Sequence, residues 1–275
     1  KALSADERVL ALVRPPSTHP ITARFSTHES PSDGLVRFLV NDVEFISDSV
    51  GITQHNCKDF YKGTDQGWYP ISEELDITRS LGENIHDNII SKPEAERTTK
   101  TEFYVIKGEA GSGKTILLRR LGWQSRSQGI GIFLWVKSRG SVNLDFIEEL
   151  ATKTKERIFV LWDDAAVNAI EISRFVTKSQ RRKIAVTIIT AERYNEWNTR
   201  CEELDELVTD KFELRYLNEK EIEALLHKLD SHDSLGPILS SKSLEDRKND
   251  FREIHGRQLL VAMHEATMGE PFEDI

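Results

Sequence analysis

The residues with the clearest chemistry lie in one glycine-rich segment, FYVIKGEAGSGKT, which spans residues 103–115. Gly108, Gly113, Lys114 and Thr115 fill the pattern G-x-x-x-x-G-K-[ST]. In this pattern the glycines let backbone N–H groups turn inward on a β-phosphate, the lysine reaches the β- and γ-phosphate oxygens, and the threonine hydroxyl is a ligand of Mg²⁺. We therefore predict a phosphate-binding loop between a strand and a helix, formed by Gly108, Glu109, Ala110, Gly111, Ser112, Gly113, Lys114, Thr115 and Ile116.

Two consecutive aspartates could complete a metal site beside this loop. Asp163 and Asp164 follow the apolar run 158–162. A phosphate-binding loop takes its metal partner from the end of another central strand. We predict that Thr115 and Asp163 hold Mg²⁺, and that Asp164 polarises the attacking water. A strand-end turn with two solvated acids is the alternative.

A further candidate lies at the end of the next apolar run, 184–190, which continues into Ala191, Glu192 and Arg193. Strand ends at the same edge of a parallel sheet face a common ligand. Thr190 or Arg193 could therefore reach a γ-phosphate, and a guanidinium suits that task because it neutralises phosphoryl charge in a fixed geometry. Simple solvation of Arg193 at the surface is the alternative.

The elements that must position these residues follow from the hydrophobic pattern after residue 100, where strand-like runs alternate with helical ones. Strands are predicted at 103–107, 130–136, 158–162, 184–190 and 211–214. Helices are predicted near 114–125, 143–151, 166–178 and 195–208. The strands are almost continuously apolar, as expected when both faces of a sheet are covered. We predict an α/β fold with three layers, α/β/α, around a parallel sheet of about five strands.

The chain after the sheet reads as a small helical subdomain, residues 215–275. Asn218 and Glu221 form a capping-box pattern at the start of its first helix, and two more helices are predicted near 243–255 and 257–268. The resulting division is an N-terminal accessory region (1–100), a nucleotide-binding domain (101–214) and the helical subdomain.

The accessory region is predicted to be largely irregular. A helical stripe in residues 1–14 ends before two prolines, and 17–32 has the composition of a linker. Residues 35–40 and 43–46 look like a small hairpin. The segment 60–80 carries an aromatic cluster, which could either cover a nucleotide base or pack a subdomain.

Composition excludes several classes of protein. The chain has 275 residues, 38% hydrophobic and 30% charged, with a net charge of −9, so a generic nucleic-acid surface is not indicated. A basic run, 178–183, is expected to be a solvated loop at the edge of the sheet opposite the phosphates, and a contact with another subunit of an oligomer or with nucleic acid is the alternative. Cys57 and Cys201 do not form a C-x-x-C pair, which argues against a disulfide framework or a zinc site.

No apolar run is long enough to span a bilayer, and we expect a cytoplasmic protein without a membrane partner. The chain starts at Lys1, and its only methionines are Met263 and Met268, as expected of a fragment or a processed product.

Together, these motifs resemble a known family. GEAGSGKT, FVLWDDA, the ending at 190–193 and the run 212–217 leading into 219–226 are similar to the signalling ATPases called STAND NTPases, the group that contains NACHT and NB-ARC proteins. The similarity covers about residues 100–265. Segment 60–80 also resembles the region before the phosphate loop in bacterial STAND proteins associated with phage defence.

The resemblance implies a P-loop NTPase fold that binds ATP or ADP with Mg²⁺ and hydrolyses ATP slowly or under regulation. It assigns phosphate and metal roles to the glycine-rich loop, metal and water roles to Asp163 and Asp164, and a γ-phosphate sensor role to Arg193. Family members often carry Gly-x-Pro in the helical lid, with the proline on the adenine. Here the corresponding stretch is 256–260, and Gln258 replaces the proline.

The resemblance also implies an oligomerisation switch in bacterial innate immunity, which couples ligand sensing to an attached effector. Homo-oligomers are expected on activation, with an effector domain before this chain, a sensor domain after it and a phage protein as a candidate trigger. Two alternatives stay open. One is an AAA+-like motor or loader acting on nucleic acid or protein, and the other is a scaffold that keeps nucleotide as a structural cofactor.

Overall fold

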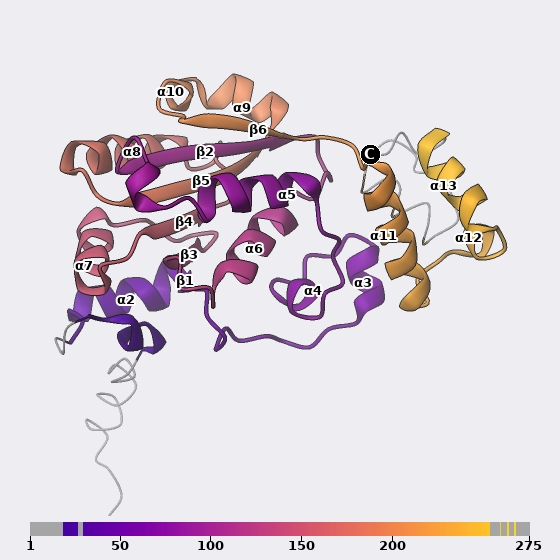
Figure 1. Cartoon of the computed structure of the whole chain (residues 1–275), viewed down its shortest axis with the longest axis horizontal. Coiled ribbons are helices and arrows are strands. Elements are labelled where there is room, and N and C mark those ends of the chain that lie inside the picture. The colour runs from indigo at the N-terminus through magenta and orange to yellow at the C-terminus, as the bar shows by residue number, and fades with distance from the viewer. Residues whose placement is uncertain (1–18, 27–29, 254–258, 260–262, 264–266, 268–275) are drawn as a thin grey trace, which may run out of the picture.

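The computed structural model describes residues 19–26 and 30–253, together with 259, 263 and 267. It shows an α/β domain with a smaller helical part at one end (Figure 1). The helical stripe predicted in 1–14 lies outside the described residues, as does most of the helix predicted at 257–268.

In the described part of the chain six strands form one sheet, in the order β1-β3-β4-β5-β2-β6. Their bounds are β1 Val43–Phe45, β2 Thr101–Gly108, β3 Ile132–Val136, β4 Ile158–Trp162, β5 Val186–Arg193 and β6 Asp210–Leu214. Strand β1 is antiparallel to β3, and all other neighbours are parallel. The mostly parallel α/β sheet is therefore confirmed, with one antiparallel edge strand added to the five that were predicted.

Alternate residues of the central strands β2, β3, β4 and β5 enter two hydrophobic cores, one on each face of the sheet. One face is covered by α2 (Asp33–Asn41), α7 (Leu144–Thr154), α8 (Ala169–Arg182), α9 (Tyr194–Arg200) and α10 (Glu202–Asp205). The other is covered by α5 (Ser80–Ile85), η2 (His86–Ile90) and α6 (Lys114–Ser125). In β2, for example, Phe103 and Val105 face the first core, and Tyr104 and Ile106 face the second. This arrangement is the predicted three-layer fold.

The hairpin predicted before residue 50 is wrong in its first strand. Residues 33–41 form helix α2, which Ser32 caps by accepting a hydrogen bond from the Leu35 N–H at 3.1 Å. The α2 residues that pack in the first core recur at helical spacing and form one face: Leu35, Phe38 and Leu39. The second predicted strand exists as β1, but it pairs with β3. A short apolar run does not distinguish a buried helix from a strand, and packing decided for the helix.

Other boundaries also moved. Strand β5 continues to Arg193, three residues beyond its predicted end. The helix predicted at 195–208 is two short helices, α9 and α10, which meet at Cys201. The basic run forms the end of α8 and its C-cap. There Arg182 pairs with Asp145 and Glu148 at 2.6 and 2.8 Å, which anchors the end of α8 to α7.

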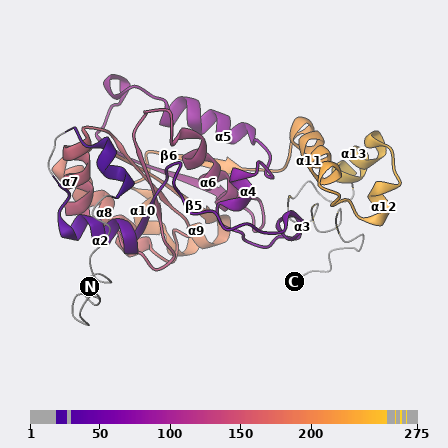
Figure 2. The same cartoon turned by 90° about the horizontal axis from the view of Figure 1, so that it is seen from below.

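The helical part contains α11 (Glu219–Ser231), α12 (Pro237–Ser240) and α13 (Leu244–Glu253). The capping box of Asn218 and Glu221 is confirmed, with both reciprocal hydrogen bonds present. Residues 57–79, which we call the strap, include α3 (Cys57–Tyr61) and α4 (Tyr69–Ser72). Strap residues Tyr61 and Leu75 share a hydrophobic core with α11 and α13. Figure 2 shows α3 and α4 on the side of the α/β domain that faces the helical part.

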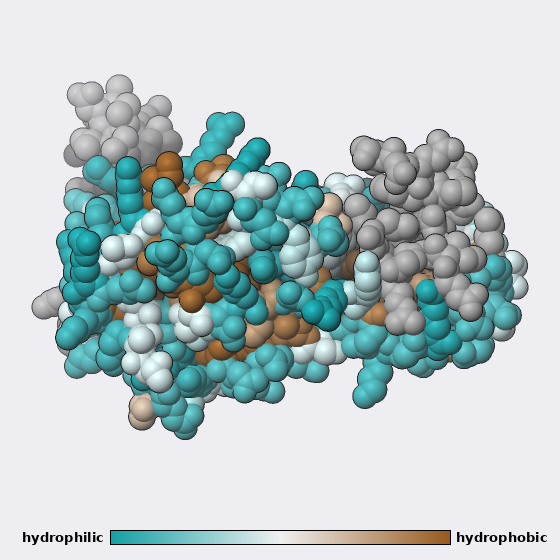
Figure 3. Space-filling model, turned by 90° about the horizontal axis from the view of Figure 1, so that it is seen from above, coloured by the Kyte–Doolittle hydropathy of each residue, from teal (hydrophilic) through white to brown (hydrophobic). Residues whose placement is uncertain are grey.

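The remaining short elements are η1 (Pro20–Arg24) and η3 (Glu94–Glu96). Hydrophilic side chains cover most of the face shown in Figure 3, and hydrophobic ones show through near the middle of the α/β domain. Within the described residues, no helix has both the length and the apolar character needed to cross a bilayer.

Candidate functional site

The glycine-rich loop joins the end of β2 to the start of α6, as predicted. Gly113 has φ +88°, a left-handed conformation that disfavours any side chain. A Cβ on Gly108 would lie 2.7 Å from Ser112 Oγ and 2.9 Å from the Leu214 carbonyl oxygen. Glycine is therefore required at position 113 by the backbone conformation and at position 108 because a side chain would clash. Backbone N–H groups at a helix N-terminus of this kind favour a bound phosphate.

Lys114 is the first residue of α6, and its ammonium group folds back on the loop. Its Nζ donates to the carbonyl oxygens of Gly108 and Glu109, at 3.1 and 2.7 Å. Burial lowers the pKa of Lys114, and the charge of Arg193 lowers it further. Two cationic side chains and a helix N-terminus thus converge on one place, where an anion of high charge would relieve their repulsion.

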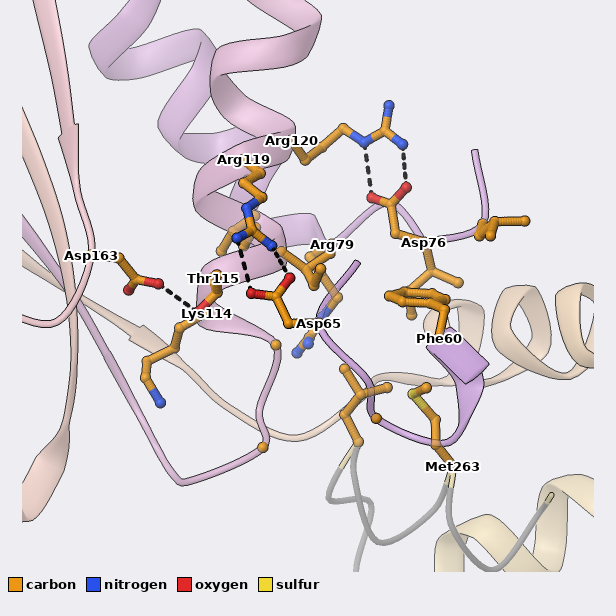
Figure 4. A pocket seen from close by; sticks show the side chains of 18 of the residues that line it. Phe60, Asp65, Asp76, Arg79, Lys114, Thr115, Arg119, Arg120, Asp163 and Met263 are labelled. Atoms are coloured by element: carbon orange, nitrogen blue, oxygen red, sulfur yellow. Dashed lines mark hydrogen bonds and ion pairs between the residues drawn. The ribbon is translucent and has the colours of Figure 1, made fainter. Parts of the chain in front are cut away.

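Thr115 and Asp163 meet directly, although they come from different elements. The Thr115 hydroxyl donates to Asp163 Oδ2 at 2.6 Å (Figure 4). Burial raises the pKa of Asp163, and the neighbouring Asp164 also raises it, whereas the hydrogen bond from Thr115 opposes the shift. A buried carboxylate with a like charge beside it is stabilised by a cation.

This pair fits Mg²⁺, because a hydroxyl and a carboxylate are hard oxygen ligands. Within the described residues no group of three or more His, Cys, Asp or Glu is arranged to hold a metal. Mg²⁺ in nucleotide sites is typically held by one or two protein groups, with phosphates and water completing the octahedron. The residues present therefore match a nucleotide-dependent metal site.

The turn after β4 carries Asp164, whose φ is +53°. A buried carboxylate, Glu192, holds this turn against the end of β5: it accepts from the Ala166 N–H at 2.6 Å and from the Arg193 N–H at 2.7 Å. Because both bonds are made by backbone N–H groups, Glu192 fixes the main chain on each side of the site.

Of the two candidates at the end of β5, Arg193 lies at the site and Thr190 does not. The Thr190 hydroxyl is fully buried and donates to the Trp162 carbonyl oxygen at 2.5 Å, so it joins β5 to β4. Arg193 pairs in register with Gly108 and lines the same pocket as Lys114. Its sensor role stays a prediction.

These residues line a cavity of about 310 Å³ at the carboxyl edge of the sheet. Its walls on the sheet side include Gly111, Gly113, Lys114, Thr115, Asp163, Asp164, Glu192 and Arg193. Strap residues 60–65 and 75–79 contribute to the opposite wall, together with Leu225 of α11 and residues 259 and 263. Figure 4 shows Lys114, Thr115 and Asp163 on one side and Phe60 and Met263 on the other. The predicted site residues thus come together, and their roles toward a nucleotide remain predictions.

The strap is attached to α6 by two arginine–carboxylate pairs (Figure 4). Arg119 binds both oxygens of Asp65, at 2.6 and 3.1 Å. Arg120 binds both oxygens of Asp76, with its Nε 2.8 Å from Oδ2. Bidentate pairs of this kind fix orientation as well as distance, so the strap wall is held in register with the phosphate loop.

The aromatic cluster of the strap packs in hydrophobic cores, which is one of the two roles predicted for it. Trp68 is buried between Trp123 and Trp135, with ring centroids 6.1 and 5.7 Å away. Tyr61 is fully buried, and its hydroxyl donates to the Leu75 carbonyl oxygen at 3.0 Å. Phe60 and Tyr61 nevertheless line the cavity. Whether they cover a base stays a prediction, and Gln258 lies outside the described residues.

Comparison with known families bears on this site. The family model described as Novel STAND NTPase 5 matches residues 58–205, more than half of the chain. The chain belongs to this family. The matched range includes the strap, the phosphate loop, the aspartate pair and Arg193, so the resemblance to STAND NTPases is confirmed.

Solved structures similar to this STAND NTPase are distant. They include C. elegans PCH-2 (15% identity, TM-score 0.46, covering 69% of this chain and 62% of that one). Others are the HORMA:CdnC:Trip13 complex of E. coli MS115-1 (16%, 0.43, 70% and 71%) and the extended conformation of the S. cerevisiae Hsp104:casein complex (14%, 0.49, 82% and 39%). The chain spans less than two thirds of the PCH-2 and Hsp104 chains. At these TM-scores the similarity supports no assignment of a role to any residue. A search of curated proteins found no match.

Sequence reasoning missed three kinds of residue in this STAND NTPase. Glu192 could have been suspected, because it is an acid at the end of an apolar strand. The strap carboxylates that bind α6, Asp65 and Asp76, carry no local signal. The same is true of Arg79, the last residue of the strap, which is buried although it is charged. Its contacts reach residues far away in the sequence, so no spacing rule predicts them.

Proposed function

We propose that this STAND NTPase binds ATP or ADP with Mg²⁺ and uses the nucleotide to switch between arrangements of its α/β domain and helical part. One observation supports the proposal most: the cavity is walled by both parts, with Lys114 and Thr115 on one side and Leu225 and Met263 on the other. A ligand shifts such an equilibrium only through different affinity for the two states. Near-complete switching, from 1:99 to 99:1, takes about 5.5 kcal/mol of that difference.

The chain's own residues have defined tasks in this proposal. The α6 N-terminus and Lys114 bind the β- and γ-phosphates, and Arg193 faces the γ-phosphate. Mg²⁺, held by Thr115 and Asp163, supplies neutralisation of charge on the phosphate oxygens. Asp164 orients the attacking water, while Glu192 keeps the backbone of that turn in place. Hydrolysis by such a site is slow until the helical part permits it.

The base is proposed to lie between the strap and the helical part. Apolar and aromatic side chains line that end of the cavity, among them Phe60, Tyr61, Leu225 and Met263. Bases bind well in apolar clefts that have a few polar groups for orientation. ADP would then hold the helical part against the α/β domain, and exchange for ATP would release it.

The signalling part of the proposal is supported by the family match and by the resemblance to anti-phage STAND proteins. We propose that release of the helical part lets chains form homo-oligomers and activates an attached effector when a trigger, such as a phage protein, is sensed. Light scattering of the purified chain with ATP, with ADP and without nucleotide tests the first step. A particle mass that does not change between these conditions would contradict it.

Nucleotide binding is tested by titration calorimetry with Mg²⁺-ADP and Mg²⁺-ATP. Lys114→Ala is expected to abolish binding. Lys178→Ala, which removes an exposed lysine from the far end of α8, serves as the matched control and should bind normally. Equal binding by wild type and Lys114→Ala would remove the phosphate-site assignment.

Turnover is tested by phosphate release. Asp163→Ala and Asp164→Ala are expected to bind nucleotide but not to hydrolyse it. Normal hydrolysis by either variant would remove its assigned role. Rapid multiple turnover stimulated by DNA or by an unfolded protein would favour a motor instead of a switch.

A further inference from the structure

Arg79 connects three parts of the molecule through one guanidinium group. Its Nη1 donates to the Ser112 carbonyl oxygen at 3.1 Å, inside the phosphate loop. Its Nη2 donates to the Arg215 carbonyl oxygen at 2.7 Å, in the linker between β6 and α11. Its Nε lies 3.3 Å from Oε2 of Glu221, in the first turn of α11. The side chain is 8% exposed and that of Glu221 is 6% exposed, so solvent does not compete for these contacts.

The contact with Ser112 bears on the direction of a phosphate-binding group. The described residues contain no cis peptide bond, and in a trans peptide the C=O of one residue and the N–H of the next point to opposite sides. By holding the Ser112 carbonyl, Arg79 turns the Gly113 N–H the other way. The residues that line the two cavities agree with this orientation: Gly113 lines the main cavity with Lys114, whereas Ser112 lines a second cavity.

The contact with Glu221 bears on the position of the helical part. The Glu221 carboxylate also accepts from the Ser80 N–H at 2.8 Å and from the Asn218 N–H at 2.9 Å, the latter as part of the capping box. Displacement of α11 would take this carboxylate away from Arg79 or break the cap. Both charges are buried, and separating a buried pair is strongly unfavourable. The Ser112 carbonyl and the start of α11 therefore share one guanidinium.

We propose that Arg79 is a positioning residue that aims the Gly113 N–H at the phosphate and couples this orientation to the placement of α11. The proposal rests on the proposed function, because it names how nucleotide at the loop is sensed by the helical part. It predicts that loss of the guanidinium abolishes the coupling between the phosphate loop and the start of α11, while both segments stay folded.

The test compares Arg79→Lys with Arg97→Lys, a matched control. Arg97 is another arginine whose side chain is buried, 2% exposed, and it holds main-chain carbonyls, with its Nη2 2.7 Å from the Ile89 oxygen and 2.8 Å from the Lys92 oxygen. It pairs with Glu102 near the start of β2, at the end of that strand opposite the loop. Both substitutions keep the charge and lose the planar fork that reaches several oxygens at once. Arg79→Met provides the stronger perturbation.

Hydrogen exchange measured by mass spectrometry on peptides covering 108–113 and 215–222 is the first readout, on nucleotide-free protein. Arg79→Lys is expected to raise exchange in both segments. Arg97→Lys should raise exchange only around 89–102. Mg²⁺-ADP affinity is the second readout, with an expected loss of about tenfold for Arg79→Lys, the value of one weakened hydrogen bond to a charged group, and a change below twofold for Arg97→Lys.

The decisive comparison uses saturating ADP. In the wild type ADP should slow exchange in both segments. In Arg79→Lys it should slow exchange in the loop but not at the start of α11, a result that simple destabilisation does not produce. Equal protection of both segments in Arg79→Lys overturns the proposal. An ADP affinity of Arg79→Lys equal to that of the wild type also overturns it. If the wild type binds no ADP, the proposed function fails, and the nucleotide-free exchange alone decides the coupling: a rise confined to one segment rejects it.

Discussion

Replacement of Gly113 by alanine isolates the backbone of the phosphate loop from its side chains. Gly113 has φ +88°, and the left-handed region costs an L-residue about 1–2 kcal/mol. The new Cβ would lie 2.9 Å from Leu259 Cδ2, the end of a flexible side chain that can move away. The expected loss of stability is therefore about 1–2 kcal/mol, or roughly 2–8 °C in melting temperature for a chain of this size.

Binding should suffer more than stability. If the loop relieves its strain by leaving the left-handed conformation, the Gly113 N–H no longer faces the phosphate. A hydrogen bond to a charged group contributes about 1.5–3 kcal/mol, so affinity for Mg²⁺-ADP should fall about 10- to 100-fold. The assay is calorimetric titration at a temperature well below the melting transition, so that both proteins are folded.

Gly129→Ala is the matched control. Gly129 has φ +69°, and an added Cβ would meet no atom within 4 Å. It lies just beyond the C-terminal end of α6, a helix of about 18 Å, so it has the same conformational cost far from the loop. It should lower the melting temperature similarly and leave ADP affinity unchanged. Wild-type affinity in Gly113→Ala, or an equal loss of affinity in both variants, would refute the reasoning.

Two further predictions concern charged pairs. Asp76→Ala should destabilise the chain by about 3–5 kcal/mol because the Asp76 carboxylate is buried. Asp65→Ala should cost no more than about 1 kcal/mol because the Asp65 side chain is 66% exposed. Urea unfolding measures the free energy of unfolding of both variants, and equal losses would contradict the distinction. Burial acts to raise the pKa of Glu94. Hydrogen bonds from Arg157 and Lys100 outweigh this effect and lower the pKa from 4.5 to about 2. Since the folded-state pKa is depressed, the stability advantage of wild type over Glu94→Gln should be constant above pH 4.5 and should shrink as the pH falls toward 2; an advantage that does not change across this window would show that the charge of Glu94 is not stabilising.

The site could be predicted from sequence where its requirements are local. The phosphate loop needs glycine at two positions and a lysine and threonine at the start of a helix, so Gly108, Gly113, Lys114 and Thr115 mark it within a few residues. The bounds of α6 agree with those predicted, residues 114–125. The capping box at Asn218 was also predictable, since both of its hydrogen bonds lie within one turn. Asp163 followed from the rule that parallel strands end at a common edge.

Where local patterns were ambiguous, prediction failed for a physical reason. Residues 35–40 are apolar except for Arg37, so the sequence is compatible with either a strand or a buried helix, and packing against the first core selected α2. The predicted helix at 195–208 divides at Cys201, which is fully buried. Thr190 and Arg193 were both candidates from the sequence, and the sensor role was assigned to Arg193. Register across the sheet placed one in the core and the other in the pocket.

The sequence by itself determined that this chain has a phosphate loop, an acid at the end of a second strand and a mostly parallel sheet, because each depends on residue type at a short fixed spacing. Only the tertiary structure decided what surrounds them. Arg79 meets Ser112 across 33 positions and Arg215 across 136, and the strap meets α6 through pairs 54 and 44 positions apart. Contacts of that range depend on how the chain folds back on itself, and periodicity along the sequence carries no information about them.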